Sequence, residues 1–180
     1  MIKSNYYEDN PDILSHIDNF IDWEELVKLY EDDFQDAKTY DETGNERLAY
    51  APRSVDEAVE YYRQLLQTVG DLNGNQVSQI AQSLDRKGLE FKDGKVTHPP
   101  EYVEMFEKIH EAGIHPTEFQ RRFGGLGLPH VVKALGAELA HRADPSFSIG
   151  AGCVNLAAIL EMYASEEMCE EWLPKLIENK

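Results

Sequence analysis

The sequence predicts an all-α protein, a helical bundle with one short β-hairpin. Almost every stretch with periodic apolar residues repeats them at the 3.6-residue spacing of an amphipathic helix. Capping residues, glycines and prolines divide these stretches into lengths that are typical of helices in globular domains. One short piece, around residue 93, has instead the pattern of two strands joined by a tight turn.

The composition indicates a globular chain and argues against two classes of partner. Of the 180 residues, 42% are hydrophobic and 28% are charged, which is enough apolar material for a core. The 34 acidic and 17 basic residues leave a net charge of −17, unsuited to nucleic acid or an anionic membrane. The sequence has no apolar run of membrane-spanning length and no signal-peptide core, so a cytoplasmic location is expected.

We expect residues 1–52 to form an N-terminal helical extension that ends in a linker. Apolar residues repeat at helical spacing from Ile13 to Phe34. Asp22 followed by Glu25 forms a capping box, so a helix should begin at Asp22. Residues 38–53 lose the periodicity and are predicted to be linker. The domain boundary is therefore placed after residue 52, and residues 53–180 are expected to form the second unit.

The second unit should begin with a long helix capped by Ser54. Ser54 and Glu57 form another capping box, and a helical apolar stripe runs on to Leu84. Gly70 and Gly74 interrupt this stripe and are expected to bend or break the helix. The dipeptide that follows at residues 93–94, Asp-Gly between two apolar residues, predicts the tight hairpin.

Helices are predicted for most of the remaining chain. One begins at Pro100 and stops at Gly113, and a second is opened by Pro129 and broken at residues 144–146. No charge occurs from residue 146 to residue 160, which predicts a central helix surrounded by protein. Ser165 should cap the last helix, and three of its side chains are expected to face inward: Trp172, Leu173 and Leu176.

The glycine-rich stretch FGGLGLP, residues 123–129, invites comparison with phosphate-binding loops. In a dinucleotide loop of the form G-x-G-x-x-G, the third glycine would stand where this chain has His130. A P-loop would require Gly-Lys-Ser/Thr, and no such tripeptide follows. We therefore expect a turn in which the glycines relieve backbone strain between two helices.

Motifs by themselves identify no active site. The six histidines lack the spacing of a helical zinc site, and the many carboxylate pairs are expected on solvated faces. Cys153 and Cys169 give no disulfide framework and should be small buried residues. The chemistry has to be inferred from the order of features instead.

Four segments, taken in order, are more informative than any single motif. They are KGLEFKDGKVTHPPEYVEMFEKIHEAGI, FGGLGLP, ELAHRADPSFSIGAG and SEEMCEEWLPKL. Together they resemble the N-terminal helical domain of the acyl-CoA dehydrogenase family, and most closely its larger members with an additional N-terminal segment. One departure is local: Met168 and Cys169 replace the Gln-Lys that the family usually has in its last helix.

The resemblance implies an FAD-dependent oxidoreductase. Family members remove the α proton of an acyl-CoA with a glutamate while the flavin accepts a hydride from the β carbon. The flavin-binding β domain and the C-terminal helical domain with the base follow this domain in the family, and both are expected to be absent here. We therefore expect no FAD on this chain by itself and no turnover. The complete enzyme would use acyl-CoA and an electron-transfer partner, and would be a homo-oligomer.

The resemblance also implies candidate substrate-binding residues. The uncharged helix lines the deep end of the acyl-chain site in the family, and the matching positions are Ile149, Gly152, Cys153 and Leu156. Their spacing is compatible with one helix face, although the same stripe is compatible with plain helix core. A second function class also stays open, namely a stand-alone helical interaction module derived from this domain.

Overall fold

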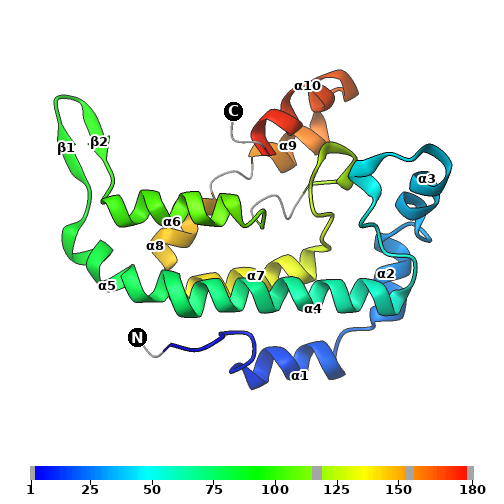
Figure 1. The fold of residues 1–180 in the computed structure, drawn as a ribbon, viewed down its shortest axis with the longest axis horizontal. Helices are drawn as coiled ribbons and strands as arrows, with labels where there is room; N and C mark the ends of the chain where they lie inside the picture. Colours follow the sequence, from blue (N-terminus) through cyan, green and yellow to red (C-terminus); the bar gives the residue numbers. More distant parts are fainter. Residues whose placement is uncertain (1–2, 115–118, 153–155, 178–180) are drawn as a thin grey trace.

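The computed structural model describes residues 3–114, 119–152 and 156–177 of the chain. The described residues form a helical bundle with one two-stranded sheet, as the sequence predicts (Figure 1). The elements in chain order are α1 (Pro11–Asn19), α2 (Trp23–Tyr30), α3 (Gln35–Thr43), η1 (Glu46–Leu48), α4 (Val55–Leu72), η2 (Asn73–Val77), α5 (Ser78–Lys87), β1 (Glu90–Lys92), β2 (Lys95–Thr97), α6 (Pro100–Glu111), η3 (Arg121–Phe123), α7 (His130–Ala143), α8 (Pro145–Gly152), α9 (Leu156–Tyr163) and α10 (Glu166–Ile177).

A rod made of α4, η2 and α5 runs along the molecule and organises the core. Figure 1 shows α1 on one side of this rod and α6 on the other, with α7 running beside α4. The main core joins residues from the N-terminal helices to α4 and α7, among them Ile13, Ile17, Val27, Tyr62 and Leu139. Because each such side chain contributes about 1.5–3 kcal/mol on full burial, residues before 53 are packed firmly onto the rest.

The N-terminal helices follow their capping residues. The Asp22 carboxylate accepts a hydrogen bond from the Glu25 amide at 3.1 Å, so α2 begins where the capping box predicts. The linker prediction for residues 38–53 is wrong in its first half, because α3 extends to Thr43 and is followed by η1. α3 buries only Ala37, so its sequence shows no apolar stripe that would have predicted it. The division of the chain after residue 52 stays a prediction.

Gly70 and Gly74 allow the N-terminal segment to pack closely against the rod. The helix is not broken there, since α4 passes through the π-helical η2 directly into α5. A Cβ added to Gly70 would overlap the backbone of Tyr7, and one added to Gly74 would overlap the carbonyl oxygen of Ser4. The amide of Tyr6 donates to the Gly70 carbonyl at 3.1 Å. The two glycines therefore let the N-terminal segment cross the rod.

The predicted hairpin is confirmed. β1 and β2 pair antiparallel, with Phe91 opposite Val96 and Lys92 opposite Lys95. The turn residues 93 and 94 both have positive φ, 51° and 77°, as a two-residue type I′ connection requires. Both strands are exposed along their whole length, and the hairpin projects from one end of the molecule (Figure 1).

The later helix boundaries also agree with the sequence. Gly113 has a φ of 67° just beyond α6, the left-handed conformation that a helix end favours. The Asp144 carboxylate accepts from the amides of Ser146 and Phe147, at 2.9 and 3.1 Å, so it ends α7 and caps the next helix. Within the described residues, no helix has both the length and the apolar character that a membrane crossing demands.

The burial of two later segments differs from the prediction. The uncharged segment is not surrounded by protein, because Ile149 and Ile159 are 63% and 54% exposed. Trp172 does not face inward either: it is 47% exposed, and the Lys175 ammonium lies 4.5 Å from its ring centre. Leu173 is buried as expected. Periodicity gives the face of a helix, but it does not show whether another element covers that face.

Candidate functional site

The glycine turn owes its composition to the backbone, as its spacing predicts. Gly124 and Gly127 have φ values of 97° and 59°, in the left-handed region that favours glycine. Gly125 has an ordinary φ, but an added Cβ would overlap the carbonyl oxygen of Phe119. All three glycines are thus required for the chain to pass from η3 into α7.

Side chains from three elements hold the carbonyl groups of this turn. The carbonyls of residues 126, 127 and 128 accept hydrogen bonds from Tyr61 at 3.4 Å, Arg121 at 3.1 Å and Tyr30 at 2.8 Å. Tyr30 belongs to α2 and Tyr61 to α4, whereas Arg121 opens η3. The N-terminal helices therefore help to fix the turn.

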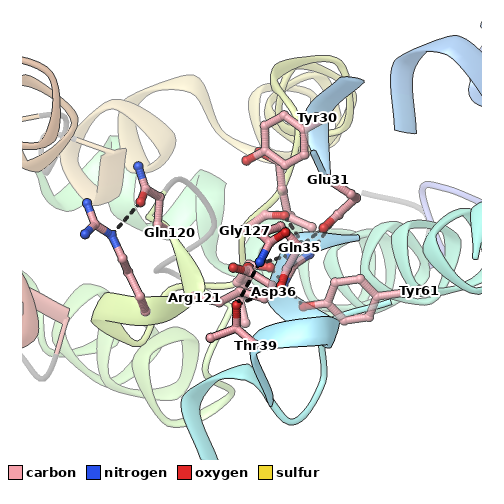
Figure 2. A network of polar contacts seen from close by, with 12 residues as sticks. Tyr30, Glu31, Gln35, Asp36, Thr39, Tyr61, Gln120, Arg121 and Gly127 are labelled. Atoms are coloured by element: carbon pink, nitrogen blue, oxygen red, sulfur yellow. Dashed lines mark hydrogen bonds and ion pairs between the residues drawn. The ribbon is translucent and has the colours of Figure 1, made fainter. Parts of the chain in front are cut away.

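Arg121 forms a buried ion pair with Glu31 at the centre of this arrangement (Figure 2). Its Nη1 and Nη2 atoms lie 2.6 and 2.9 Å from the two carboxylate oxygens of Glu31, and Nη1 lies 3.2 Å from Asp36 Oδ2. The Tyr62 hydroxyl donates to the same Glu31 carboxylate at 2.7 Å. Such two-pronged contacts are the strong form of the arginine–carboxylate pair. Because the guanidinium is already engaged, it does not offer an anion site.

The network changes the proton affinity of its members. Burial raises the pKa of Tyr30 to about 12. Burial and then the negative charge of Glu31 raise the pKa of Tyr62 well above its usual range. Burial works against the charge of Arg121, but the hydrogen bonds and charge of Glu31 outweigh it and raise the pKa of the guanidinium. Both tyrosines are therefore held neutral in the folded chain.

We expect the chain to lose stability between pH 10 and pH 12. The folded-state pKa of Tyr30 is about 12 and its ordinary value is 10.0. The stability that the chain gains from keeping this hydroxyl neutral is therefore complete below pH 10 and is lost as pH rises to 12. Urea midpoints measured across this range should fall less steeply for Tyr30→Phe. Tyr50→Phe, at an 85% exposed position, is the matched control and should keep the full slope. Equal slopes for all three proteins would contradict the assignment.

A separate cavity of about 970 Å³ opens between α5, the base of the hairpin, α6 and α8. The His98 ring stacks on Tyr102 with centroids 4.4 Å apart, and Tyr102 meets Phe147 edge-on at 5.0 Å. Gly150 of α8 also lines the cavity, and a Cβ there would overlap the Tyr102 hydroxyl. This wall is partly aromatic, which suits a ligand with an apolar body. Among the described residues, no group of three metal-ligating side chains could hold an ion.

The predicted substrate-binding residues are placed only in part. Ile149 lies on α8 and is largely exposed, Gly152 ends α8, and Leu156 begins α9. Cys153 and the side chain of Leu156 lie outside the described residues. Their common face therefore stays a prediction. Sequence reasoning missed Arg121 and Glu31, and the only local signal was an arginine pair before the glycines in an otherwise acidic chain.

The fold and the site define a class: a helical domain with one short hairpin, in which a glycine turn leads into α7 and then into the uncharged helix α8. The family model described as "Acyl-CoA dehydrogenase, N-terminal domain" matches residues 59–180. The chain belongs to the acyl-CoA dehydrogenase family and contains its N-terminal domain. The matched region includes most of α4 and every later element.

The chain is also similar to a curated protein, the 3-methylmercaptopropionyl-CoA dehydrogenase of Ruegeria pomeroyi. The two are 26% identical over 132 residues, which make up 73% of this chain. The same residues make up 22% of the relative, so the match covers about a fifth of that protein.

Proposed function

We propose that this chain is the N-terminal portion of an FAD-dependent acyl-CoA dehydrogenase and contributes a wall of the acyl-chain pocket. The observation that carries the proposal is the exposure of large apolar side chains on α8 and α9, namely Ile149, Ile159, Met162 and Tyr163. An exposed apolar surface marks a place where a ligand or another protein surface binds. In a member of this family, it would meet the acyl chain and the domain that binds the flavin.

The acyl-lining residues would be Ile149, Gly152, Cys153 and Leu156. Gly152, Cys153 and Leu156 follow Ile149 by three, four and seven residues, which is the spacing of positions on one helix face. They stand in a stretch without charge, which suits contact with an aliphatic chain. Alternatively, part of this stripe serves as ordinary helix core.

FAD would accept the hydride in the complete enzyme, and reoxidation would require an electron-transfer partner. We assign no described residue of this chain to the flavin. The buried cation that could otherwise neutralise a phosphate, Arg121, is already paired with Glu31 and Asp36. A cytoplasmic homo-oligomer is part of the same proposal.

Replacing Leu156 by tryptophan in the complete enzyme should shorten the range of acyl chains that it accepts. The larger side chain would fill the deep end of the pocket, so kcat/KM for the longest substrate should fall about tenfold or more, while short chains are retained. Dye reduction over a series of acyl-CoA lengths measures this. Leu29→Trp, at an 82% exposed position on α2, is the control. An unchanged length profile would remove Leu156 from the pocket.

A stand-alone interaction module is the second candidate. It is favoured by the same kind of surface, since Met168 and Trp172 of α10 are also exposed, at 46% and 47%, and could meet a protein partner. The coding region beyond Lys180 separates the two: an in-frame flavin-domain motif such as Thr-Glu-Pro supports the enzyme, and a stop codon supports the module. A yellow 180-residue protein that reduces a dye with acyl-CoA would show that our placement of the flavin site outside this chain is wrong.

A further inference from the structure

The cavity between α5, the base of the hairpin, α6 and α8 is not accounted for by the proposed acyl wall. Its volume of about 970 Å³ lies at the upper end of the range of about 300–1,000 Å³ that is usual for ligand pockets. Ile149, the proposed acyl-lining residue whose side chain the structure describes, is not among the residues that line it. Figure 1 shows α5 and α6 leading to and from the hairpin, with α8 beside α6. The cavity is therefore a candidate for a ligand of its own.

One wall of the cavity consists of aromatic rings. The His98 ring lies nearly parallel to the Tyr102 ring, with 16° between the planes and 4.4 Å between the centroids. The buried Phe147 ring meets Tyr102 edge-on at 5.0 Å. His98 itself is exposed, so one face of its ring is open to a further flat group. Offset stacking of rings at such distances is favourable, and this wall therefore suits an aromatic ligand.

The α5 side of the cavity begins at the π-helical turn η2. Ser78 and Gln79 follow η2 directly, and both line the cavity. Their donor groups are used within the rod: Ser78 Oγ donates to the Gly74 carbonyl at 2.7 Å, and Gln79 Nε2 donates to Ser78 Oγ at 2.8 Å. The carbonyl oxygen of the Gln79 side chain is thereby left as an acceptor. π-helical turns occur frequently at functional sites, which agrees with a ligand here.

The charged groups that line the cavity favour a cation. Asp144 is only 9% exposed, and its Oδ1 atom accepts from two amides at the start of α8 at 2.9 and 3.1 Å. Within the described residues, Asp144 Oδ2 and the exposed carboxylate of Asp85 have no hydrogen bond or ion pair. Arg142 also lines the cavity, but its Nη1 and Nη2 atoms lie 2.6 and 3.2 Å from Asp9. The lining therefore offers acceptors to a donor and leaves neither the guanidinium nor these amides for an anion.

We propose that this cavity binds a small organic cation with a flat aromatic body, that is, an aromatic amine. The ring of the ligand stacks on the open face of His98, and its ammonium group donates to Asp144 Oδ2. Hydrogen bonds between two ionised groups are stronger than neutral ones, so the buried carboxylate selects for the positive charge. A carboxylate ligand of the same shape would instead be repelled by Asp85 and Asp144.

Isothermal titration calorimetry of the 180-residue chain tests the site with tryptamine as the probe. Indole-3-propionate is the matched anion, since it carries the same ring on a chain of similar length. At about 0.15 M salt, which screens the general attraction of a cation to an acidic chain, tryptamine should bind at one site. We expect its dissociation constant to be below about 1 mM and that of indole-3-propionate to be about tenfold higher or more.

Substitutions separate the charge from the stacking. Asp144→Asn keeps an acceptor for the two amides and removes the charge, so it should weaken tryptamine binding about tenfold and leave the uncharged 3-methylindole unaffected. Tyr102→Leu removes the central ring and should weaken both ligands. Asp12→Asn makes the same charge change at an exposed position of α1, outside the cavity, and should have no effect. If Asp144→Asn unfolds the chain, Asp85→Asn at its exposed position repeats the charge test.

Nuclear Overhauser effects between the ligand and the protein locate the site. We expect them from the indole ring of tryptamine to the rings of His98 and Tyr102. Equal affinities for tryptamine and indole-3-propionate, equal effects of the cavity and α1 substitutions, or ligand contacts to Trp23, which lines a different cavity, would each overturn the proposal. These measurements use no acyl-CoA or flavin, so their failure is distinguishable from failure of the proposed dehydrogenase function.

Discussion

Replacing Arg121 by methionine is expected to lower the free energy of unfolding by about 3–5 kcal/mol, because it leaves a buried carboxylate without its partner. The side chains of Arg121 and Glu31 are only 6% and 2% exposed, so water cannot take the place of the lost guanidinium. The substitution also removes the donor to the Gly127 carbonyl, which loosens the glycine turn. Urea unfolding followed by circular dichroism measures the change.

Two controls show whether burial is the cause. Adding Glu31→Leu to Arg121→Met removes the stranded charge, so the double variant should be more stable than Arg121→Met. Arg122→Met breaks the neighbouring pair with Glu166, whose side chains are 46% and 56% exposed, and should cost less than about 1 kcal/mol. If Arg121→Met and Arg122→Met cost the same, the buried pair does not stabilise the fold as we describe.

Replacing Gly125 by alanine is expected to lower the free energy of unfolding by more than about 3 kcal/mol, an effect of the size that backbone displacement produces. The added Cβ would overlap both the carbonyl oxygen and the Cβ of Phe119, and neither is the end of a flexible side chain. The backbone of the turn would have to move, and with it the carbonyls held by Tyr61, Arg121 and Tyr30.

Gly136 provides the matched control for this substitution. It lies inside α7, and the nearest atoms to an added Cβ, on Leu66 and Val69, are 3.9 and 4.0 Å away. Gly136→Ala should therefore stabilise the chain by about 0.5–1 kcal/mol, the gain of alanine over glycine within a helix. Thermal unfolding of both variants decides the matter. The steric explanation fails if Gly125→Ala melts at or above the temperature of Gly136→Ala.

Local interactions account for the predictions that succeeded. Asp22, Ser54 and Asp144 cap helices through amides two or three residues further on, so the sequence around each residue is sufficient to identify it. The Asp93-Gly94 turn is equally local, because its positive φ values follow from its residue types. α3 was missed because it buries a single side chain, and so leaves no apolar stripe in the sequence.

The candidate site was predicted less completely, for a physical reason. The family followed from segment order, whereas the four pocket positions stay a prediction. A stripe such as the one at Ile149 and Leu156 does not show whether a neighbouring element covers it. The large exposure of Ile149 was therefore visible only in the structure. The role of Gly70 and Gly74 was equally hidden, because the chain that approaches them lies more than sixty positions earlier.

The sequence by itself determined the all-α class, the hairpin and the glycine turn, because each depends on residue types within a few positions of one another. It determined the family through the order of four such segments along the chain. Only the tertiary structure decided what holds the glycine turn. Arg121 meets Glu31 across 90 positions of sequence, and Tyr30 reaches the turn across 98. Contacts between residues so far apart in the sequence form only when α2 and η3 pack together, and no local sequence pattern predicts them.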